Sequence, residues 1–383
     1  MVAISVENTA MEKLFTAIGL MSGTSLDGMD AALVRTDGQQ TTEYITDYYL
    51  KFDRSFALGL AAIAKGEAPL TEVLRLERQL TQKAVEAVQG LLQKARQKSG
   101  SNKTSELNVS GDAPVDVIGF HGQTLRHLPA EGLTFQMGDS SYLAEKTGIP
   151  VVGDFRRRDM AAGGEGAPLA SYYHKAILAG HLEDKPQVVV NLGGVANITC
   201  FTPDGSIVAG DVGPGCGLLD KWMVQHFDQP YDIDGQKALA GRVDMKWISE
   251  TLKKEPFFNQ PLPKSADRYQ FDTCWPEHLS PEDGAATLAA LTTEAVAQAA
   301  HAVTPAEKGL WLTGGGAANQ AMVRGFGKNF SPVRPIDDIG IPAEFLEAAC
   351  FAWLAVRRLA GLPTSGPQTT GAEKQTTGGV LTV

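Results

Sequence analysis

The chain has 383 residues, more than a single hydrophobic core usually serves, so we expect two domains. Its 34 basic and 44 acidic residues give a net charge of −10, and the only basic run, Arg156–Arg158, is too short to form a nucleic-acid track. Four widely spaced cysteines form no zinc or disulfide pattern and no apolar run is long enough to span a membrane, so we expect a cytoplasmic protein without nucleic-acid or membrane partners.

Residues 1–13 are expected to form a loose extension, after which the chain forms a hairpin. Two apolar runs between Ile18 and Val34 are joined by a turn rich in glycine and hydroxyl side chains. Such a turn offers backbone N–H groups to a phosphate, and the nearby carboxylates of Asp27 and Asp30 suit the Mg²⁺ that a polyphosphate carries. The same residue types are common in ordinary solvated turns, so this turn alone does not establish a site.

A third strand is expected at Tyr44–Phe52, and helical periodicity follows from residue 70 to about 96. The polar segment 97–114 predicts a surface loop or a disordered insertion. The apolar run Val115–Phe120 predicts a buried strand that ends at His121. That end would place polar groups where open α/β sheets bind ligands, although a histidine capping a turn is an equally good explanation.

A mixed charge cluster follows the next predicted elements, a short helix at 138–147 and a strand at 149–153. It begins with Asp154 and Arg156 and leads through a glycine-rich turn to a helix that starts at Pro168. Acid and base at a strand end could bind an anionic ligand through an arginine fork. A solvated charge run is the more common explanation of such clusters.

The second half of the chain repeats the theme of the first. Val188–Thr199 is again a pair of apolar runs around a glycine turn, which suggests a duplicated fold. Asp211 stands at the edge of a Gly/Pro turn that leads into a helix near residues 218–227. A carboxylate in that place is a candidate general base, although for a single aspartate an Asx turn or a helix cap is the more common explanation.

Residues 228–280 are expected to be mostly loop lining a cleft, with short helices near 235–240 and 244–253, and an alanine-rich helix follows at 281–302. A buried strand at 310–313, three glycines and a helix then form an arrangement suited to contact a nucleotide. The last long helix is expected at 341–359, followed by a polar tail with a short strand at 379–383. The glycine turns, the neighbouring acids and the lack of a P-loop pattern predict a nucleotide held between two related α/β lobes.

Seven segments together resemble the 1,6-anhydro-N-acetylmuramic acid kinase family, in the order expected for it. They are LMSGTSLDGMDAALV at 20–34, HGQT at 121–124, DFRRRDMAAGGEGAPL at 154–169, VNLGGVANIT at 190–199, DVGPGCGLLD at 211–220, LTGGGAANQ at 312–320 and PAEFLEAACFAWLA at 342–355.

The resemblance implies an α/β fold of two RNase H-like lobes with an interlobe cleft, as in the actin/hexokinase/Hsp70-like ATPase superfamily. The first lobe would be residues 14–150 and the second 151–363, with the last helix (342–360) packing back near the hinge and 364–383 as a C-terminal tail. It also implies that ATP, Mg²⁺ and water convert 1,6-anhydro-N-acetylmuramic acid to N-acetylmuramic acid 6-phosphate during peptidoglycan recycling, and that the protein is a homodimer.

The resemblance further implies roles for particular residues. The ATP-binding set would be Gly23, Thr24, Ser25, Leu26, Asp27, Gly28, Met29, Asp30, Asn191, Gly193, Gly194, Gly314, Gly315 and Gly316. Asp211 would be the base and Asp27 would hold Mg²⁺. The residues around the sugar would be His121, Asp154, Arg156 and Glu344.

Two other functions stay open. The chain departs from the family pattern at Cys216 and at 264–269, which is compatible with a kinase of the same fold that acts on another sugar. The chain could also be an ATP-driven binding protein that phosphorylates no small molecule. A substrate screen separates the first alternative, and ATP turnover that no sugar affects would favour the second.

Overall fold

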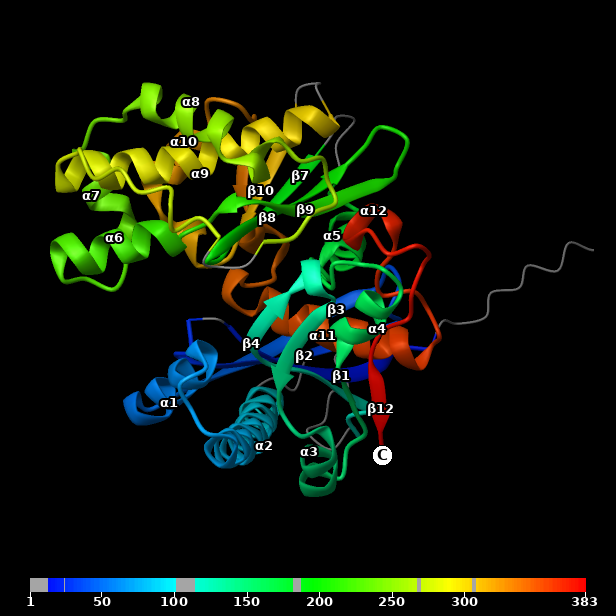
Figure 1. The fold of residues 1–383 in the computed structure, drawn as a ribbon. Coiled ribbons are helices and arrows are strands. Elements are labelled where there is room, and N and C mark those ends of the chain that lie inside the picture. The colour runs from blue at the N-terminus through cyan, green and yellow to red at the C-terminus, as the bar shows by residue number, and fades with distance from the viewer. Residues whose placement is uncertain (1–12, 24, 101–113, 182–186, 267–269, 305–307) are drawn as a thin grey trace, which may run out of the picture.

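The computed structural model describes residues 13–23, 25–100, 114–181, 187–266, 270–304 and 308–383. In these ranges the chain forms two sheets, one in each half of the molecule, with helices packed on their outer sides (Figure 1). Thr24, nearly all of the expected N-terminal extension and most of the expected insertion at 97–114 lie outside the described residues.

The first sheet grows from the predicted hairpin. Its strands within the described ranges are β1 (Phe15–Ser22), β2 (Gly28–Thr36), β3 (Thr42–Lys51), β4 (Val117–Leu128), β5 (Leu133–Met137), β6 (Val151–Gly153) and β12 (Val380–Thr382). The order is β3-β2-β1-β4-β6-β12, with β5 paired to β4. β1, β2 and β3 form an antiparallel meander, and β4 and β6 continue the sheet parallel to β1.

The second sheet repeats this plan. Its described strands are β7 (Gln187–Leu192), β8 (Val195–Phe201), β9 (Ile207–Pro214), β10 (Gly309–Thr313) and β11 (Val333–Pro335). The order is β9-β8-β7-β10-β11, again an antiparallel meander of three strands followed by two parallel strands. This strand order, found twice, is the RNase H-like arrangement, so the predicted duplication and the predicted fold class are confirmed.

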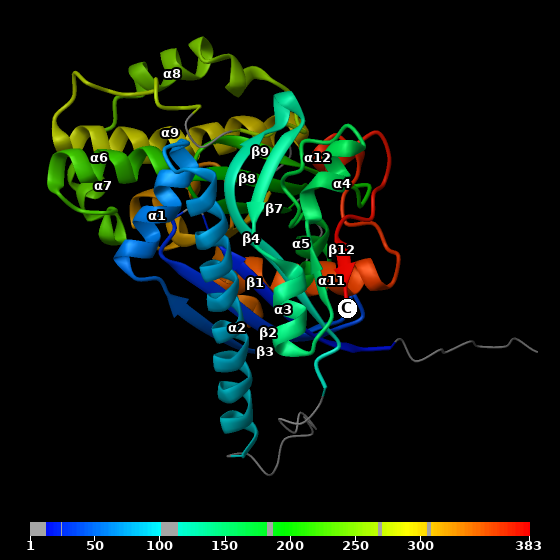
Figure 2. The same cartoon turned by 60° about the horizontal axis from the view of Figure 1, so that its bottom comes forward.

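Helices pack against both sheets, most of them on the outer faces. They are α1 (Arg54–Lys65), α2 (Leu70–Gly100), α3 (Ser140–Thr147), α4 (Phe155–Ala161), α5 (Ser171–Leu178), α6 (Gly217–Phe227), α7 (Gln236–Ala240), α8 (Met245–Lys254), α9 (Pro281–Val303), α10 (Gln320–Phe326), α11 (Leu346–Leu359) and α12 (Pro367–Thr370). α2 packs against β2 and β3, and α9 packs against β8 and β9 (Figures 1 and 2). No helix in the described part of the chain is long and apolar enough to cross a membrane.

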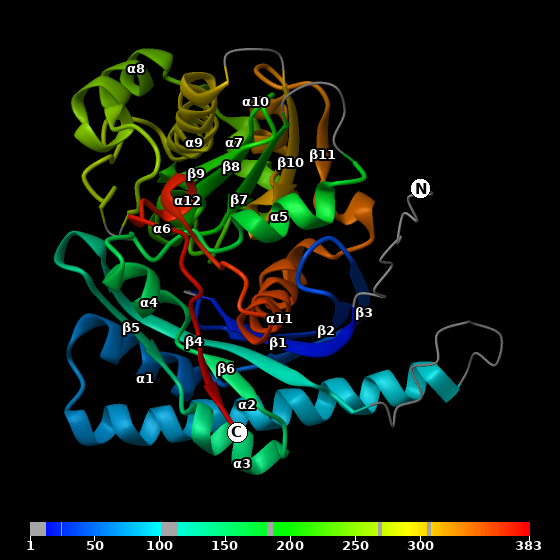
Figure 3. The ribbon, with the colours of Figure 1, turned by 90° about the vertical axis from the view of Figure 1, so that its right-hand side faces the viewer.

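The last long helix, α11, lies between the sheets and packs on β1, β2 and β4 (Figure 3). This approach requires glycine, because a Cβ on Gly19 would lie 1.7 Å from the carbonyl oxygen of Ala348, and one on Gly119 would lie 2.0 Å from that of Phe351. The α11 positions facing these strands are small or apolar, and nearly all are buried. α11 therefore carries residues from the second half of the chain onto the first sheet.

Two strands beyond residue 150 belong to the first sheet, although the predicted lobe boundary falls at that residue. β6 pairs in parallel with β4, and β12, at the C-terminus, pairs antiparallel with β6. A boundary read from a single pass along the chain misses such returns, because sheet membership depends on pairing between distant segments.

Three elements differ from the sequence-based expectation. β4 does not end at His121 but continues to Leu128 and forms an arm with β5 (Figure 2). α1 was not expected, although Asp53 accepts a hydrogen bond from the N–H of Phe56 and caps it. α4 was taken for a charged strand end; it is a short helix that buries Phe155 and Met160 and exposes two of its arginines.

Candidate active site

A narrow cavity of about 90 Å³ lies between the two sheets, and both halves of the chain line it. Its charged and amide-bearing lining residues are Arg156, Asn191, Asn197, Asp211 and Glu347. They come from α4, β7, β8, β9 and α11. The two sheets and α11 thus bring together side chains that are far apart in the sequence.

Asp211 lies on β9 and is only 7% exposed. Its Oδ2 atom accepts hydrogen bonds from the backbone N–H of Ala266 at 2.8 Å and from Ser265 Oγ at 3.1 Å. Burial raises the pKa of Asp211 to about 6, although these two donors and the charge of Arg156 oppose the rise. The carboxyl group is therefore largely ionised at neutral pH while remaining a stronger base than an exposed aspartate.

Arg156 projects into the same cavity and is held at two points. Its Nε donates to Nε2 of His121 at 3.1 Å, and its Nη1 donates to the carbonyl oxygen of Gly166 at 2.7 Å. His121 is 2% exposed and its Nδ1 lies 2.9 Å from the carbonyl oxygen of Gly122. Burial and the charge of Arg156 lower the pKa of His121 well below its ordinary value, so the ring is neutral, with Nδ1 as the donor and Nε2 as the acceptor.

His121 was predicted to contact the sugar, but the structure places it behind Arg156. Both of its ring nitrogens already have protein partners, and the ring packs on Phe351 at 4.5 Å between centroids. This position indicates that His121 orients the guanidinium of Arg156. The carboxylate of Asp154, also predicted at the sugar, lies 3.5 Å from Arg157, outside the cavity lining.

Glu347, which the sequence reasoning missed, lines the cavity, whereas the predicted Glu344 is exposed and does not. Glu347 Oε1 accepts a hydrogen bond from Asn191 Nδ2 at 3.2 Å. Burial raises the pKa of Glu347, and the charge of Arg156 lowers it. The two glutamates are three residues apart, Glu344 in the 3-10 turn Ala343–Phe345 and Glu347 in the first turn of α11, so the sequence contained the candidate. Which one faces the cavity depends on how this turn and the helix pack on the sheet.

The first predicted phosphate turn joins β1 to β2 as expected. Asp27 is exposed at this turn and accepts a hydrogen bond from Ser25 Oγ at 2.5 Å. Asp30 lies farther in, and burial together with Glu347, Asp27 and Glu344 raises its pKa to about 7. The side chain of Met29 is fully buried in the core of the first lobe, so only its backbone can meet a ligand.

The second and third predicted turns meet around Cys216. The backbone N–H of Cys216 donates to the carbonyl oxygen of Gly193 at 2.7 Å, and the N–H of Gly217 donates to that of Gly194 at 3.1 Å. A Cβ on Gly316 would lie 2.5 Å from Cys216 Sγ. The thiol therefore fills the space between the two glycine turns.

A larger hollow of about 660 Å³ opens beside these turns. Ser25 of the first turn, Gly194 of the second and Gly217 at the start of α6 line it, and Trp275 contributes an aromatic wall. Its size is in the range of small-molecule sites. The second turn borders both spaces, because Asn191 lines the narrow cavity and Gly194 lines the hollow, so a nucleotide at that turn would lie near the cavity that Asp211 and Arg156 line.

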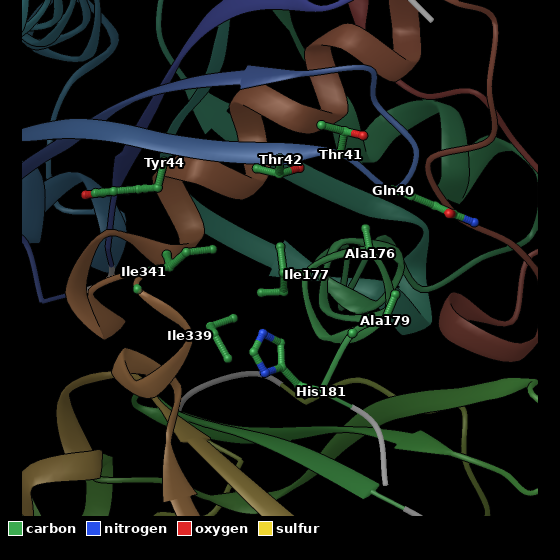
Figure 4. Close-up of a pocket in the computed structure, with 12 residues that line it drawn as sticks. Gln40, Thr41, Thr42, Tyr44, Ala176, Ile177, Ala179, His181, Ile339 and Ile341 are labelled. Carbon is green, nitrogen blue, oxygen red and sulfur yellow. The ribbon is translucent and has the colours of Figure 1, made fainter. Parts of the chain in front are cut away.

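Another cavity of about 600 Å³ lies away from all the predicted site residues (Figure 4). Its walls come from the segment 40–44, the end of α5 and the segment 339–341. Figure 4 shows Ile177, His181 and Ile339 gathered beneath Thr42. Asp, Glu, Lys and Arg do not occur among its described lining residues, so it does not offer the charged groups that a phosphorylated substrate requires.

The residues that the structure describes include no group of three or more His, Cys, Asp or Glu side chains able to hold a metal ion by themselves. An exposed carboxylate beside a phosphate turn is a different kind of site, in which Mg²⁺ keeps several waters and takes its other ligands from phosphate oxygens. Asp27 fits that donor set, because its carboxylate stands at the turn and is accessible.

Comparison with known proteins gives a consistent result along the whole described chain. A family model described as "Anhydro-N-acetylmuramic acid kinase" matches residues 15–383. A protein of that name from Acidiphilium cryptum (strain JF-5) is 44% identical over 371 residues, covering 95% of this chain and 97% of its own. A protein of the same name from Gluconobacter oxydans (strain 621H) is 43% identical, covering 94% of this chain and 97% of its own.

Solved structures with a similar course of the chain are more distant. Component A of (R)-2-hydroxyglutaryl-CoA dehydratase from Acidaminococcus fermentans has a TM-score of 0.46 at 11% identity, covering 90% of this chain and 99% of its own. The activator of 2-hydroxyisocaproyl-CoA dehydratase from Clostridium difficile has a TM-score of 0.41 at 11% identity, covering 91% of this chain and 96% of its own.

Proposed function

This chain belongs to the anhydro-N-acetylmuramic acid kinase family, and on that basis we propose that its interlobe cleft is the site of that reaction, with Asp211 as the general base. The enzyme converts 1,6-anhydro-N-acetylmuramic acid, ATP and water to N-acetylmuramic acid 6-phosphate and ADP. The pathway that such a kinase serves is peptidoglycan recycling.

The reaction divides into two coupled bond changes. The water oxygen bonds to the anomeric carbon as the bond from that carbon to O6 breaks, and O6 then takes the γ-phosphoryl group of ATP. Neutral water attacks an acetal poorly, so a positioned carboxylate that accepts the water proton lowers the barrier. Capture of the departing O6 by phosphate drives the ring opening forward, and positioning dominates the catalysis of that transfer.

The observation that carries this proposal is the environment of Asp211. Both hydrogen bonds that it accepts in the described part of the chain go to Oδ2, which leaves Oδ1 for the water proton. Burial has raised its pKa to about 6, the range in which a carboxylate is ionised at neutral pH and still basic enough to take a proton. Arg156, beside it, supplies a cation for an anionic part of the sugar.

ATP would lie across the glycine turns. The backbone N–H groups and hydroxyls of 23–30 and of 191–194 would hold its phosphates, and Gly314–Gly316 would contact the nucleoside. Asp27 would hold Mg²⁺, which when bound neutralises charge on the phosphates. Removing this carboxylate with Asp27→Asn should raise the Mg²⁺ concentration needed for half-maximal turnover; an unchanged Mg²⁺ requirement would refute the assignment.

The quaternary state and location follow from the family in the same way. A homodimer in the cytoplasm is the expectation, and light scattering of the purified protein and cell fractionation test the two parts separately. The sugar itself is tested by competition, since a kinase for another sugar would turn over that sugar faster than the anhydro sugar at equal concentration.

The deciding experiment follows an oxygen atom. Wild-type protein with ATP, Mg²⁺ and 1,6-anhydro-N-acetylmuramic acid in H₂¹⁸O should yield a 6-phosphate labelled at the anomeric hydroxyl, detected by mass spectrometry. Asp211→Asn should lower the rate by about 10²- to 10⁴-fold while ATP binding persists. Asp204→Asn, at an exposed turn between β8 and β9, is the matched control and should leave the rate unchanged.

A wild-type protein that binds ATP but forms no labelled product would refute the proposed reaction. Labelled product formed at the wild-type rate by Asp211→Asn would refute the proposed base while leaving the reaction in place.

A further inference from the structure

We propose that Asp159 is a positioning residue through which the C-terminal segment, residues 364–376, holds Arg156 in the cleft. The inference rests on the proposed function, because it concerns Arg156 as the cation beside Asp211. It gives the last part of the chain, which the sequence presents as a polar tail, a part in the reaction.

Asp159 is a buried carboxylate with three neutral donors. It lies on α4 with an exposed fraction of 0%. Its Oδ1 accepts hydrogen bonds from Thr370 Oγ1 at 2.6 Å and from Ser365 Oγ, and its Oδ2 accepts one from the backbone N–H of Gly166 at 2.8 Å. A buried charge is costly unless hydrogen bonds compensate it. The carboxylate therefore holds its three donors in place, and the donors in turn hold the carboxylate.

Gly166 connects this carboxylate to the cleft. Its N–H binds Asp159, and its carbonyl oxygen accepts the 2.7 Å hydrogen bond from Arg156 Nη1. The residue has a φ of +72°, and a Cβ there would lie 2.9 Å from Met160 Sδ, so no larger residue fits without a shift. A displacement of Asp159 would therefore move one of the two groups that orient the guanidinium, the other being His121.

The C-terminal segment also forms hydrogen bonds with the backbone of the loop that follows α4, residues 162–166. The carbonyl oxygen of Thr370 accepts a hydrogen bond from the N–H of Glu165 at 2.7 Å, and the N–H of Glu373 donates to the carbonyl oxygen of Ala162 at 2.8 Å. β12 meanwhile pairs with β6, the strand that leads directly into α4 (Figure 3). The segment that bears Arg156 is thus tied to the C-terminus both before and after α4.

A purely structural function for Asp159 makes a different prediction from a positioning function. The groups whose charges act on Asp211 are Arg156, Glu165 and Lys264, while His127, which contacts its partner Ser265, is neutral because burial lowers its pKa to about 4. Arg156 lowers the pKa of Asp211. If Asp159 positions Arg156, loosening it should raise that pKa, whereas loss of stability alone should not.

The first test is a pH profile of kcat/KM for Asp159→Asn, Thr370→Val and Ser365→Ala. We expect kcat/KM to fall by about 10- to 100-fold, since a 1 Å misplacement can cost that much, and the acid limb to move to higher pH. Thr370→Ser, which keeps the hydroxyl, should restore both values. Thr377→Val changes a partly buried threonine just after the segment, whose hydroxyl donates a 3.4 Å hydrogen bond to the carbonyl oxygen of Gly361 and not to Asp159; it is the control for loss of a threonine hydroxyl and should keep the wild-type acid limb.

The second test does not depend on turnover. Labelling with phenylglyoxal, followed by peptide mass spectrometry, compares Arg156 with its exposed neighbours Arg157 and Arg158 in the same molecule. Arg156 should react more slowly than these two in the wild type and should approach their rates in Asp159→Asn and Thr370→Val.

The proposal is overturned if the folded variants keep the wild-type acid limb and the wild-type labelling of Arg156. If Asp159→Asn does not fold, Thr370→Val and Ser365→Ala, each of which removes one hydrogen-bond donor to Asp159, still test the proposal. A wild-type protein without kinase activity would refute the proposed function, and the labelling result would still decide whether Asp159 positions Arg156.

Discussion

Asp211 is subject to opposing effects. Burial disfavours its charged form, while Ser265, the N–H of Ala266 and Arg156 favour it, and the result is a pKa of about 6. An aspartate in direct contact with a cation would instead have a pKa below its ordinary value. The site thereby keeps a carboxylate that is both charged and basic.

The pH dependence of turnover follows from that value. Because the base must be deprotonated, kcat/KM should fall about tenfold per pH unit below roughly pH 6. The contribution of Asp211 to the free energy of unfolding has the opposite pH dependence, because its pKa in the folded state lies above the ordinary 3.8. This contribution is fully present below pH 3.8 and is lost as the pH rises through about 6. A profile that stays flat down to pH 5, in protein still folded by circular dichroism, would contradict the assignment of the base.

Glu344, in the turn before α11, and Glu347, in the first turn of α11, give a matched pair of substitutions. Glu347→Gln removes a carboxylate that lines the cavity and accepts a hydrogen bond from Asn191, whereas Glu344→Gln changes an exposed side chain. We expect Glu347→Gln to lower kcat/KM by about tenfold or more, as for an interaction with a charged group worth 1.5–3 kcal/mol, and Glu344→Gln to lower it far less. Steady-state kinetics of the two variants measure the difference, and equal losses would show that Glu344 reaches the substrate.

At the scale of elements, the packing of α11 on the first sheet decides where the cleft residues lie. The helix supplies Glu347 and Cys350 to the cavity lining, and it can do so only because Gly19 and Gly119 let its backbone approach the strands. The β4–β5 arm likewise brings a residue of the first sheet close to the surroundings of Asp211. His127 Nε2, on β4, lies 3.5 Å from Ser265 Oγ, which donates a hydrogen bond to Asp211.

Adding one methyl group to the α11 contact should be costly. In Gly119→Ala the new Cβ would lie 2.0 Å from the carbonyl oxygen of Phe351, so the helix must shift, and we expect a loss of about 1–3 kcal/mol in the free energy of unfolding. Gly180→Ala is the control, since a Cβ there meets nothing within 4 Å. Thermal or denaturant unfolding of both variants checks this, and equal midpoints would mean that the contact is looser than the structure shows.

At the scale of the whole molecule, two lobes of the same topology enclose a cavity beside Asp211 that is small for a sugar. A volume of about 90 Å³ is below the usual range of roughly 300–1,000 Å³ for a small-molecule site. We therefore expect the lobe angle to change so that the sugar can enter beside Asp211, next to a nucleotide in the larger hollow.

Ligand-dependent lobe movement can be trapped in the inactive Asp211→Asn protein. With ATP, Mg²⁺ and the anhydro sugar bound, small-angle X-ray scattering should give a radius of gyration different from that of the free protein, and crystals with and without ligands should differ in lobe angle. The Asp204→Asn protein, which we expect to consume the substrates, serves as the comparison for the radius of gyration. One identical lobe angle in both crystal states would contradict the movement.

The duplicated fold was predictable because it has local signatures. The hairpins at 18–34 and 188–199, the triple glycine after a buried strand and the amphipathic helix from Leu70 each appear in a short window of sequence, and each occurs in the structure. Asp211 was visible as a candidate beside a Gly/Pro turn, but the family resemblance was needed to prefer a base over an Asx turn or a helix cap. These features depend on neighbouring residues alone.

The remaining features depend on contacts between distant segments. The choice of Glu347 over Glu344, the place of His121 behind Arg156 and the entry of β12 into the first sheet each require the packing of segments at least 30 residues apart. Helical or strand periodicity cannot supply such contacts, because it specifies which face of an element is apolar but not which other element covers that face. The sequence by itself thus determined two related α/β lobes and a candidate base, the family resemblance added their RNase H-like topology, and only the tertiary structure decided which charged groups surround that base and how the C-terminus reaches them.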